Sequence, residues 1–172
     1  MTRRTLTALG LLLSLTAGCN GDSFEARIAG SVDGLNMTIT TAYWGGPFIV
    51  FTDDSLDCKG LAFISKNTKD GDEPLLEYDA RILLLTYNDS DVVEGSYDFG
   101  GEAPVTAELI DISGGSMSVY RASEGTMVLD ALEDEGLASG EFAISFEENN
   151  EDLGALTGDF TLPWCINLKS SY

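Results

Sequence analysis

The stretch that decides the fold reads Ala138-Ser139-Gly140-Glu141-Phe142-Ala143-Ile144-Ser145-Phe146-Glu147. Phe142, Ile144 and Phe146 alternate with small or polar residues, and alternate side chains of an extended chain point to the same face. The pattern predicts a β-strand with one buried and one exposed face. Runs of similar length and character continue in both directions, so the sequence predicts a fold built from strands.

Turn residues such as Asp33-Gly34 and Gly114-Gly115 separate these runs. The run Ile82–Leu85 is solidly apolar, which is typical of a central strand or a short buried segment, and Leu129–Leu137 has the most helical pattern. Strands at this spacing favour an all-β fold, namely an antiparallel two-sheet β-sandwich, with a small β-barrel as the alternative. The predicted strands are residues 24–32, 35–43, 47–52, 60–65, 79–87, 95–99, 105–111, 116–121, 126–132, 138–147 and 155–165.

A short pattern recurs, in which an aromatic residue follows a glycine by two positions. It occurs at Gly95-Ser96-Tyr97, Gly140-Glu141-Phe142 and Gly158-Asp159-Phe160. A glycine at a strand entry or bulge, followed by an inward-pointing ring, is a packing device. We therefore expect these aromatics in the core and assign no chemistry to them.

Composition and charge narrow the function. Of the 172 residues 44% are apolar, which suits a single domain with a sizeable core. The chain has 29 acidic and 9 basic residues, a net charge of −20, and no histidine, so it has no Ser-His-Asp triad and no histidine-ligated metal. The charge argues against nucleic acid as a partner, because binding phosphates needs cations. It fits a solvated surface, adaptation to salty surroundings, or cation capture.

The N-terminal residues have the pattern of an export signal. Arg3 and Arg4 precede an apolar run from Leu6 to Leu15, and small residues then lead to Cys19. The apolar run is too short for a membrane-spanning helix, which needs roughly 20 residues. Residues 1–18 are therefore predicted to be a signal peptide.

The end of this segment resembles the lipobox of bacterial lipoproteins. Ala17-Gly18 stand directly before Cys19, although Thr16 occupies a position where leucine is usual. The resemblance implies that Cys19 is lipidated and becomes the first mature residue; an ordinary secretory signal beside a chance cysteine is the alternative. It also implies a Gram-negative outer membrane, since Asn20 stands where an inner-membrane retention signal has aspartate.

The predicted mature chain has a short tether, residues 19–23, and one acidic β-domain, residues 24–172. Loss of Arg3 and Arg4 changes its net charge to −22. The Gly-x-Phe pattern at Phe160, followed by Cys165, is loosely similar to small exported all-β lipoproteins, which carry no assigned activity. The side of the outer membrane on which the domain lies stays open.

Cys58 and Cys165 remain once Cys19 is lipidated. Two thiols in an exported chain predict one disulfide, here joining positions 107 residues apart. A redox or metal-binding pair is the alternative, but the chain has no Cys-x-x-Cys spacing. Trp164, beside Cys165, is expected to cover the disulfide.

Two chemistries remain for the acidic residues. The segment with Asn88, Asp89, Asp91 and Glu94 offers oxygen ligands for calcium, against a solvated hairpin loop as the simpler interpretation. Two carboxylates at a suitable distance would also serve a glycoside hydrolase, an alternative that 29 acidic residues leave open without favouring. No other cofactor is indicated.

The aromatic segment Tyr43-Trp44-Gly45-Gly46-Pro47-Phe48 is the candidate binding site. If exposed, Tyr43, Trp44 and Phe48 would stack on a glycan or contact an envelope protein; if buried, they close one end of the core. The sequence thus predicts a lipid-anchored envelope protein whose acidic β-domain serves non-enzymatic binding or structural contact.

Overall fold

The computed structural model describes residues 24–60, 79–88, 92–100 and 103–169. Within these ranges, ten strands form one hydrogen-bonded sheet in the order β2-β1-β10-β9-β8-β6-β7-β5-β4-β3. None of the helices in this part of the chain has the length and apolar character needed to span a lipid bilayer. The elements are β1 (Glu25–Val32), β2 (Leu35–Asn36), β3 (Thr41–Gly45), β4 (Phe48–Thr52), β5 (Ala80–Tyr87), β6 (Gly95–Phe99), β7 (Val105–Ser113), β8 (Ser116–Leu132), β9 (Leu137–Glu148), β10 (Glu151–Pro163) and α2 (Ile166–Lys169).

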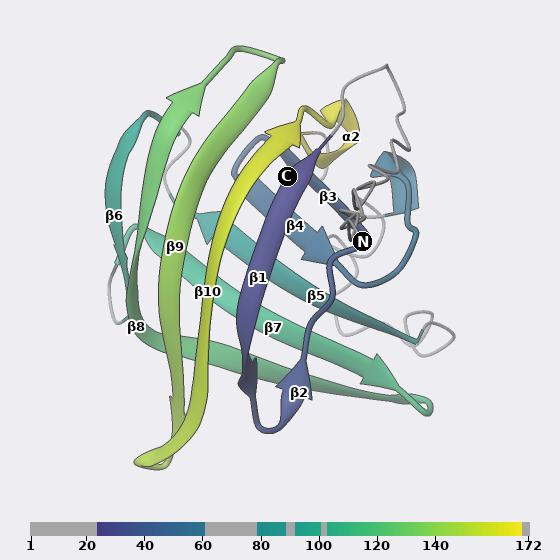
Figure 1. Ribbon diagram of the computed structural model, residues 1–172, viewed down its shortest axis with the longest axis vertical. Helices are drawn as coiled ribbons and strands as arrows, with labels where there is room; N and C mark the ends of the chain where they lie inside the picture. The colour runs from purple at the N-terminus through teal and green to yellow at the C-terminus, as the bar shows by residue number, and fades with distance from the viewer. Residues whose placement is uncertain (1–23, 61–78, 89–91, 101–102, 170–172) are drawn as a thin grey trace, which may run out of the picture.

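The sheet curls over on itself into two layers (Figure 1). Strands β1, β10 and β9 run steeply across the front, and β7, β5, β4 and β3 cross behind them at a large angle. β8 belongs to both layers, because residues 116–121 pair with β7 and residues 122–132 pair with β9. The predicted all-β fold is therefore confirmed. Its two layers are one continuous sheet, a half-barrel that agrees with the barrel alternative.

β8 carries two bulges, the first of them where the strand passes from one layer to the other. Its register with β9 shifts between Ala122 and Glu124 and again between Leu129 and Ala131. Bulges bend a strand and increase its twist, so the two predicted strands at 116–121 and 126–132 are halves of one. The helical pattern at Leu129–Leu137 was misleading, because this segment holds the second bulge, the end of β8 and the turn at residues 133–136, which together break the strand alternation.

The predicted strand at 35–43 is wrong in its extent. Residues 35–36 form β2 and residues 41–45 form β3, which are the two edges of the sheet. The chain between them crosses from one layer to the other, and the Thr40 amide donates to the Thr52 carbonyl at 2.9 Å. The predicted strand at 60–65 starts at Gly60, which is the last of the helical residues 58–60. The rest of this predicted strand lies outside the described residues.

The main core fills the space between the layers. It includes Phe51 and Leu83 from the back layer and Phe142 and Phe160 from the front layer. A second apolar cluster covers the opposite face of the back layer, where Val50, Ile82 and Leu84 pack with Leu168 of α2 and with Cys165. β4 and most of β5 are consequently buried on both faces, which agrees with the central-strand interpretation of the apolar run Ile82–Leu85.

The glycine–aromatic pattern packs two neighbouring strands together. Gly140 lies opposite Phe160, and Gly158 lies opposite Phe142. A Cβ on Gly158 would come within 2.7 Å of the Phe142 ring, so each ring occupies the space that its glycine partner leaves. Both rings also contact Phe51 across the core, with centroids 5.7 and 5.6 Å away. This confirms the expected inward rings at Phe142 and Phe160.

Candidate functional site

The predicted aromatic platform is part of the core. Tyr43, Trp44 and Phe48 are 8%, 5% and 2% exposed, so they offer no surface for stacking on a ligand. The β3–β4 hairpin is covered on both faces: Trp44 faces the main core, and Tyr43 and Phe48 face the second cluster. The expectation of an exposed ring platform is thereby corrected in favour of the core interpretation.

Gly45 allows the C-terminal segment to lie directly against this hairpin. A Cβ at this position would come within 2.3 Å of the Cys165 carbonyl oxygen and 3.0 Å of the Leu168 Cβ. The Cys165 amide donates to the Trp44 carbonyl at 2.7 Å, and Trp44 and Trp164 form an isolated parallel bridge. The end of the chain is thus placed against the edge strand β3.

The predicted disulfide is confirmed. Cys58 and Cys165 are bonded, with their Cα atoms 5.7 Å apart across a sequence separation of 107 residues. The bond joins the helical residues 58–60 to the segment that leads into α2. The Asn167 side-chain amide donates to the Cys58 sulfur at 3.2 Å and adds to this junction.

The predicted calcium ligands are only partly described. Asp89 and Asp91 lie outside the described residues. The Asn88 side-chain amide donates to the Ala103 carbonyl at 3.1 Å, and a Glu94 carboxylate oxygen accepts the Leu132 amide at 3.1 Å. Within the described ranges no group of three or more acidic or cysteine side chains is arranged to hold a metal ion.

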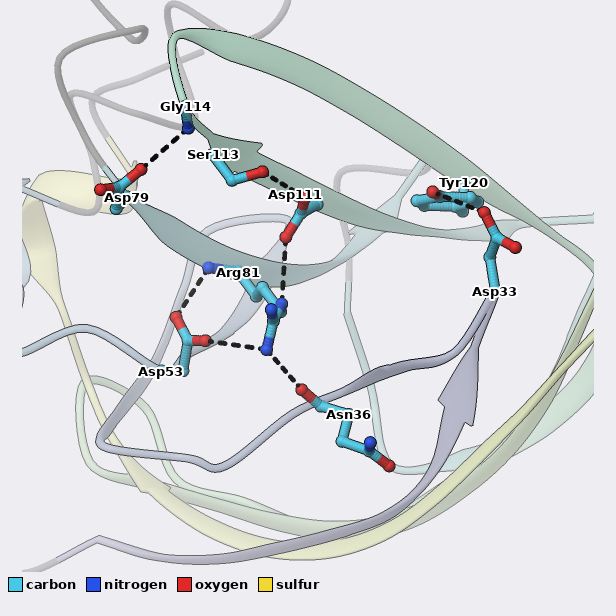
Figure 2. Close-up of polar contacts among 9 residues, drawn as sticks. All are labelled: Asp33, Asn36, Asp53, Asp79, Arg81, Asp111, Ser113, Gly114 and Tyr120. Atoms are coloured by element: carbon cyan, nitrogen blue, oxygen red, sulfur yellow. Dashed lines mark hydrogen bonds and ion pairs between the residues drawn. The ribbon is translucent and has the colours of Figure 1, made fainter.

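The fold gathers a different acidic group around Arg81 (Figure 2). The guanidinium Nε lies 3.0 Å from an Asp111 oxygen, and Nη1 lies 3.9 Å from Asp53 and donates to the Asn36 carbonyl at 2.8 Å. The Arg81 backbone amide donates to the other Asp53 oxygen at 2.7 Å, and the Ser113 hydroxyl donates to Asp111 at 2.9 Å. We call these five residues the Arg81 network.

The Arg81 network closes the core where the layers meet. Arg81 and Asp111 pair directly, two positions beyond the core residues Leu83 and Leu109 on the same faces of β5 and β7. Asn36 belongs to β2 in the other layer, so its bond with Arg81 links the layers. The network borders a hollow of about 340 Å³, but its carboxylates are already held by a cation and hydrogen-bond donors.

A second polar contact links the layers nearby (Figure 2). The Tyr120 hydroxyl of β8 donates to Asp33, in the turn between β1 and β2, at 3.1 Å. Burial raises the pKa of the Tyr120 phenol above its usual value, and the hydrogen bond and negative charge of Asp33 raise it further. Tyr120 therefore acts as a neutral donor that links β8 to the turn between β1 and β2.

Another hollow, of about 530 Å³, lies on the outer face of the front layer. Arg27, Asp159, Glu141 and Val128 stand opposite one another on four adjacent strands. The row beside them consists of Ala29, Thr157, Ala143 and Thr126, whose small side chains form the floor. We call it the outer-face hollow; it is open to solvent and has both apolar and charged residues in its lining.

The third hollow, of about 440 Å³, lies where the chain leaves β10. It combines an indole, the disulfide, an isoleucine that is 62% exposed, and charged side chains of both signs. Three segments distant in sequence form it: residues 57–59, the β8–β9 turn, and Trp164 with the first residues of α2. We call it the Trp164 hollow; it is lined by Asp57, Cys58, Lys59, Glu135, Trp164, Ile166 and Asn167.

Trp44 supports this hollow from the core side. Its ring packs edge-on against Trp164 with the centroids 4.5 Å apart. Its indole N–H donates to the Gly136 carbonyl at 3.0 Å, which holds the β8–β9 turn and therefore the neighbouring Glu135. Trp44, which the sequence nominated as a ligand contact, thus positions the residues that line the hollow.

Sequence reasoning missed most of the lining of the Trp164 hollow. Trp164 was expected only to cover the disulfide, and Ile166, Glu135 and Lys59 carry no motif. The one available signal was a tryptophan next to a cysteine that was already predicted to be bridged. Arg81 was missed because it begins an apolar run and reads as part of a buried strand.

No protein-family model, curated protein or solved structure matches this chain. The geometry defines its class: an all-β half-barrel domain with one disulfide and a ligand-sized hollow beside that disulfide.

Proposed function

We propose that the protein is a bacterial cell-envelope lipoprotein, anchored through Cys19, that binds a partner non-enzymatically at the Trp164 hollow. The observation that carries the proposal is the composition of this hollow. An indole, an isoleucine that is 62% exposed and a few polar groups line about 440 Å³. Ligand sites are typically concave, largely apolar and supplied with a few placed polar groups, at volumes of roughly 300–1,000 Å³.

Export to the envelope is supported by two features. Ala17-Gly18-Cys19 resembles a lipobox. The Cys58–Cys165 disulfide suits an oxidising compartment outside the cytoplasm. Asn20 favours the outer membrane within this class of lipoprotein, and the aromatic lining suits a glycan, an envelope protein or a lipid headgroup as the partner.

The glycoside hydrolase alternative gains no comparable support. Asp53 and Asp111, which the fold brings to the same hollow, both face the Arg81 guanidinium. Each also accepts a further hydrogen bond. Such carboxylates are committed to holding the layers together, whereas a glycosidase needs one carboxyl group to give up a proton.

The anchor is tested by replacing Cys19. The Cys19→Ala chain is expected in the soluble fraction of the exported protein, while the unaltered chain stays with membranes and its N-terminal peptide carries the mass of acyl chains. Membrane association that persists in Cys19→Ala without that mass would contradict the anchor.

The binding site is tested with a photo-reactive amino acid in place of Ile166 in growing cells. Val119 provides a matched control, because it is also a β-branched residue and is 39% exposed, on β8 and away from the hollow. We expect a discrete adduct from position 166 and none from position 119. Equal yields at both positions, or none at 166, would remove the assignment of the site.

A further inference from the structure

The Trp164 hollow lies at the end of the fold where the chain enters from Cys19. Glu25 at the start of β1 pairs with Thr161 near the end of β10, and Trp164 follows β10 directly. Leu137, at the start of β9, pairs with Pro163, which places the β8–β9 turn at the same end. In the view of Figure 1 the start of β1 and α2 lie at the same end of the molecule. We call this end the entry pole.

The tether limits how far the entry pole can lie from the anchor. Residues 20–23 separate Cys19 from Phe24, the first described residue. Four extended residues reach at most about 14 Å. A domain held at Cys19 therefore keeps its entry pole within reach of lipid headgroups, and the Trp164 hollow opens at that pole.

The charges of the hollow fit a zwitterion. Asp57 and Glu135 supply negative charge beside the Trp164 indole, and ammonium groups bind both carboxylates and the face of an indole. One Asp57 oxygen accepts the Gly60 amide at 2.8 Å, and the described part of the chain shows no donor on the second oxygen. Lys59 lines the same hollow and supplies the positive charge that a phosphate requires.

We infer that the Trp164 hollow holds the headgroup of a zwitterionic phospholipid, with the ammonium near Glu135 and Trp164 and the phosphate near Lys59. The inference rests on the proposed lipid anchor, which brings this pole to a membrane. Ile166, exposed at the rim, contacts the interfacial region beside the headgroup. An anionic lipid fits poorly, because the mature chain carries −22 and Glu133, Asp134 and Glu135 occupy the adjoining turn.

The headgroup itself is the first probe. Glycerophosphoethanolamine is titrated into the exported Cys19→Ser chain while tryptophan fluorescence is recorded; the chain has two tryptophans, and Trp44 is 5% exposed. We expect a saturable change, and a loss of affinity of about threefold in Glu135→Gln. Glu141→Gln is the matched control, with the same change of charge on the outer face of β9; it should bind like the unaltered chain.

A second pair of probes separates the two charges of the ligand. Lys59→Gln should weaken binding of glycerophosphoethanolamine but leave ethanolamine binding unchanged. Trp164→Phe removes the reporting indole, so its binding is measured by titration calorimetry beside the unaltered chain; it should weaken both, because phenylalanine is a poorer partner for a cation. A merely structural role for these residues would not produce this split.

Vesicles identify the source of the ligand. The Cys19→Ser chain should float with phosphatidylethanolamine–phosphatidylcholine vesicles and remain behind with phosphatidylglycerol vesicles. Preference for phosphatidylglycerol, or for glycerol 3-phosphate over glycerophosphoethanolamine, would overturn the inference. So would an adduct from position 166 with the mass of a glycan or a protein, or an equal effect of Glu135→Gln and Glu141→Gln.

The two proposals fail separately. If Cys19→Ala stays membrane-bound without acyl mass, the anchor is wrong whatever the headgroup titration shows. If the acyl mass is found but the headgroup gives no saturable change, the anchor stands and the headgroup assignment is wrong.

Discussion

The ring of Phe160 on β10 lies over Gly140, the residue directly opposite it on β9. A Cβ at Gly140 would come within 3.0 Å of the Phe160 Cζ and 2.2 Å of the Val128 carbonyl oxygen. The glycine therefore allows the ring and the neighbouring backbone to approach. It also shows why an aromatic two positions after a glycine recurs in these two strands: each strand supplies the ring for the other's gap.

Gly140→Ala should destabilise the domain by about 1–3 kcal/mol, the usual cost of forcing an extra methyl group into a packed core. Urea unfolding of the purified chain measures the change. Ala143→Ser adds one atom on the exposed face of the same strand and should stay within about 0.5 kcal/mol of the unaltered chain. Equal stability of Gly140→Ala and the unaltered chain would mean that the ring does not depend on the gap.

Removal of the disulfide should lower the free energy of unfolding by more than Gly140→Ala does. In the chain-entropy model, closing a loop of 107 residues stabilises the folded state by about 4–5 kcal/mol. The double variant Cys58→Ser, Cys165→Ser should lose stability by that order in urea unfolding. A reductant should lower the stability of the unaltered chain and leave the double variant unchanged; sensitivity of the double variant to reductant would point to another cause.

Arg81→Met should destabilise the domain by about 2 kcal/mol, because it leaves Asp53 and Asp111 without their cation and the Asn36 carbonyl without its donor. Asp111→Asn in the same chain should restore part of the loss by removing one uncompensated charge. Arg121→Gln is the control: its side chain is 79% exposed in an ion pair with Glu108, and such pairs contribute little. Thermal and urea unfolding should show Arg81→Met as the least stable variant, its combination with Asp111→Asn as more stable, and Arg121→Gln as close to the unaltered chain.

Alkaline pH should destabilise the domain through Tyr87. Its hydroxyl is buried against the Met127 sulfur at 3.7 Å. Burial raises the pKa of Tyr87 well above its usual value of 10.0, and the charge of Tyr97 raises it further. The unfolded chain therefore loses this proton from about pH 10, whereas the folded chain keeps it.

Its contribution to stability is thus complete below pH 10 and falls above it by about 1.4 kcal/mol for each pH unit. Urea unfolding at stepped pH measures the slope, and tyrosine absorbance reports ionisation in the folded state. Tyr87→Phe should have a shallower slope. An identical slope in Tyr87→Phe would show that other groups carry the alkaline loss.

Much of the fold could be predicted from local pattern. The alternation of Phe142, Ile144 and Phe146 placed β9 and its inward face, and the solid apolar run after Arg81 indicated a strand buried on both sides. Errors arose where contacts from other strands override the local pattern. The bulge after Leu129 and the turn at residues 133–136 together imitated a helical period, and the crossing between β2 and β3 lay inside what read as one strand.

The candidate site was harder to predict. Tyr43, Trp44 and Phe48 are large rings beside a Gly-Gly-Pro turn, which is consistent with either an exposed or a buried hairpin. Their burial depends on the C-terminal segment, which lies more than 100 residues further along the chain and is joined by Cys165 to Cys58. No local pattern contains that contact.

By itself the sequence determined the all-β class, the pairing of Cys58 with Cys165 and the inward rings of β9 and β10. The class and the rings follow from residue periodicity, and the pairing follows from the three cysteines together with the lipobox resemblance that sets Cys19 apart. All of these are properties of the chain before it folds. Only the tertiary structure decided that the layers are one curled sheet, that Arg81 closes its core, and that Trp164 and Glu135 share a hollow. Those features are juxtapositions of distant segments, and they arise from the bending of β8 and the docking of the chain's last residues.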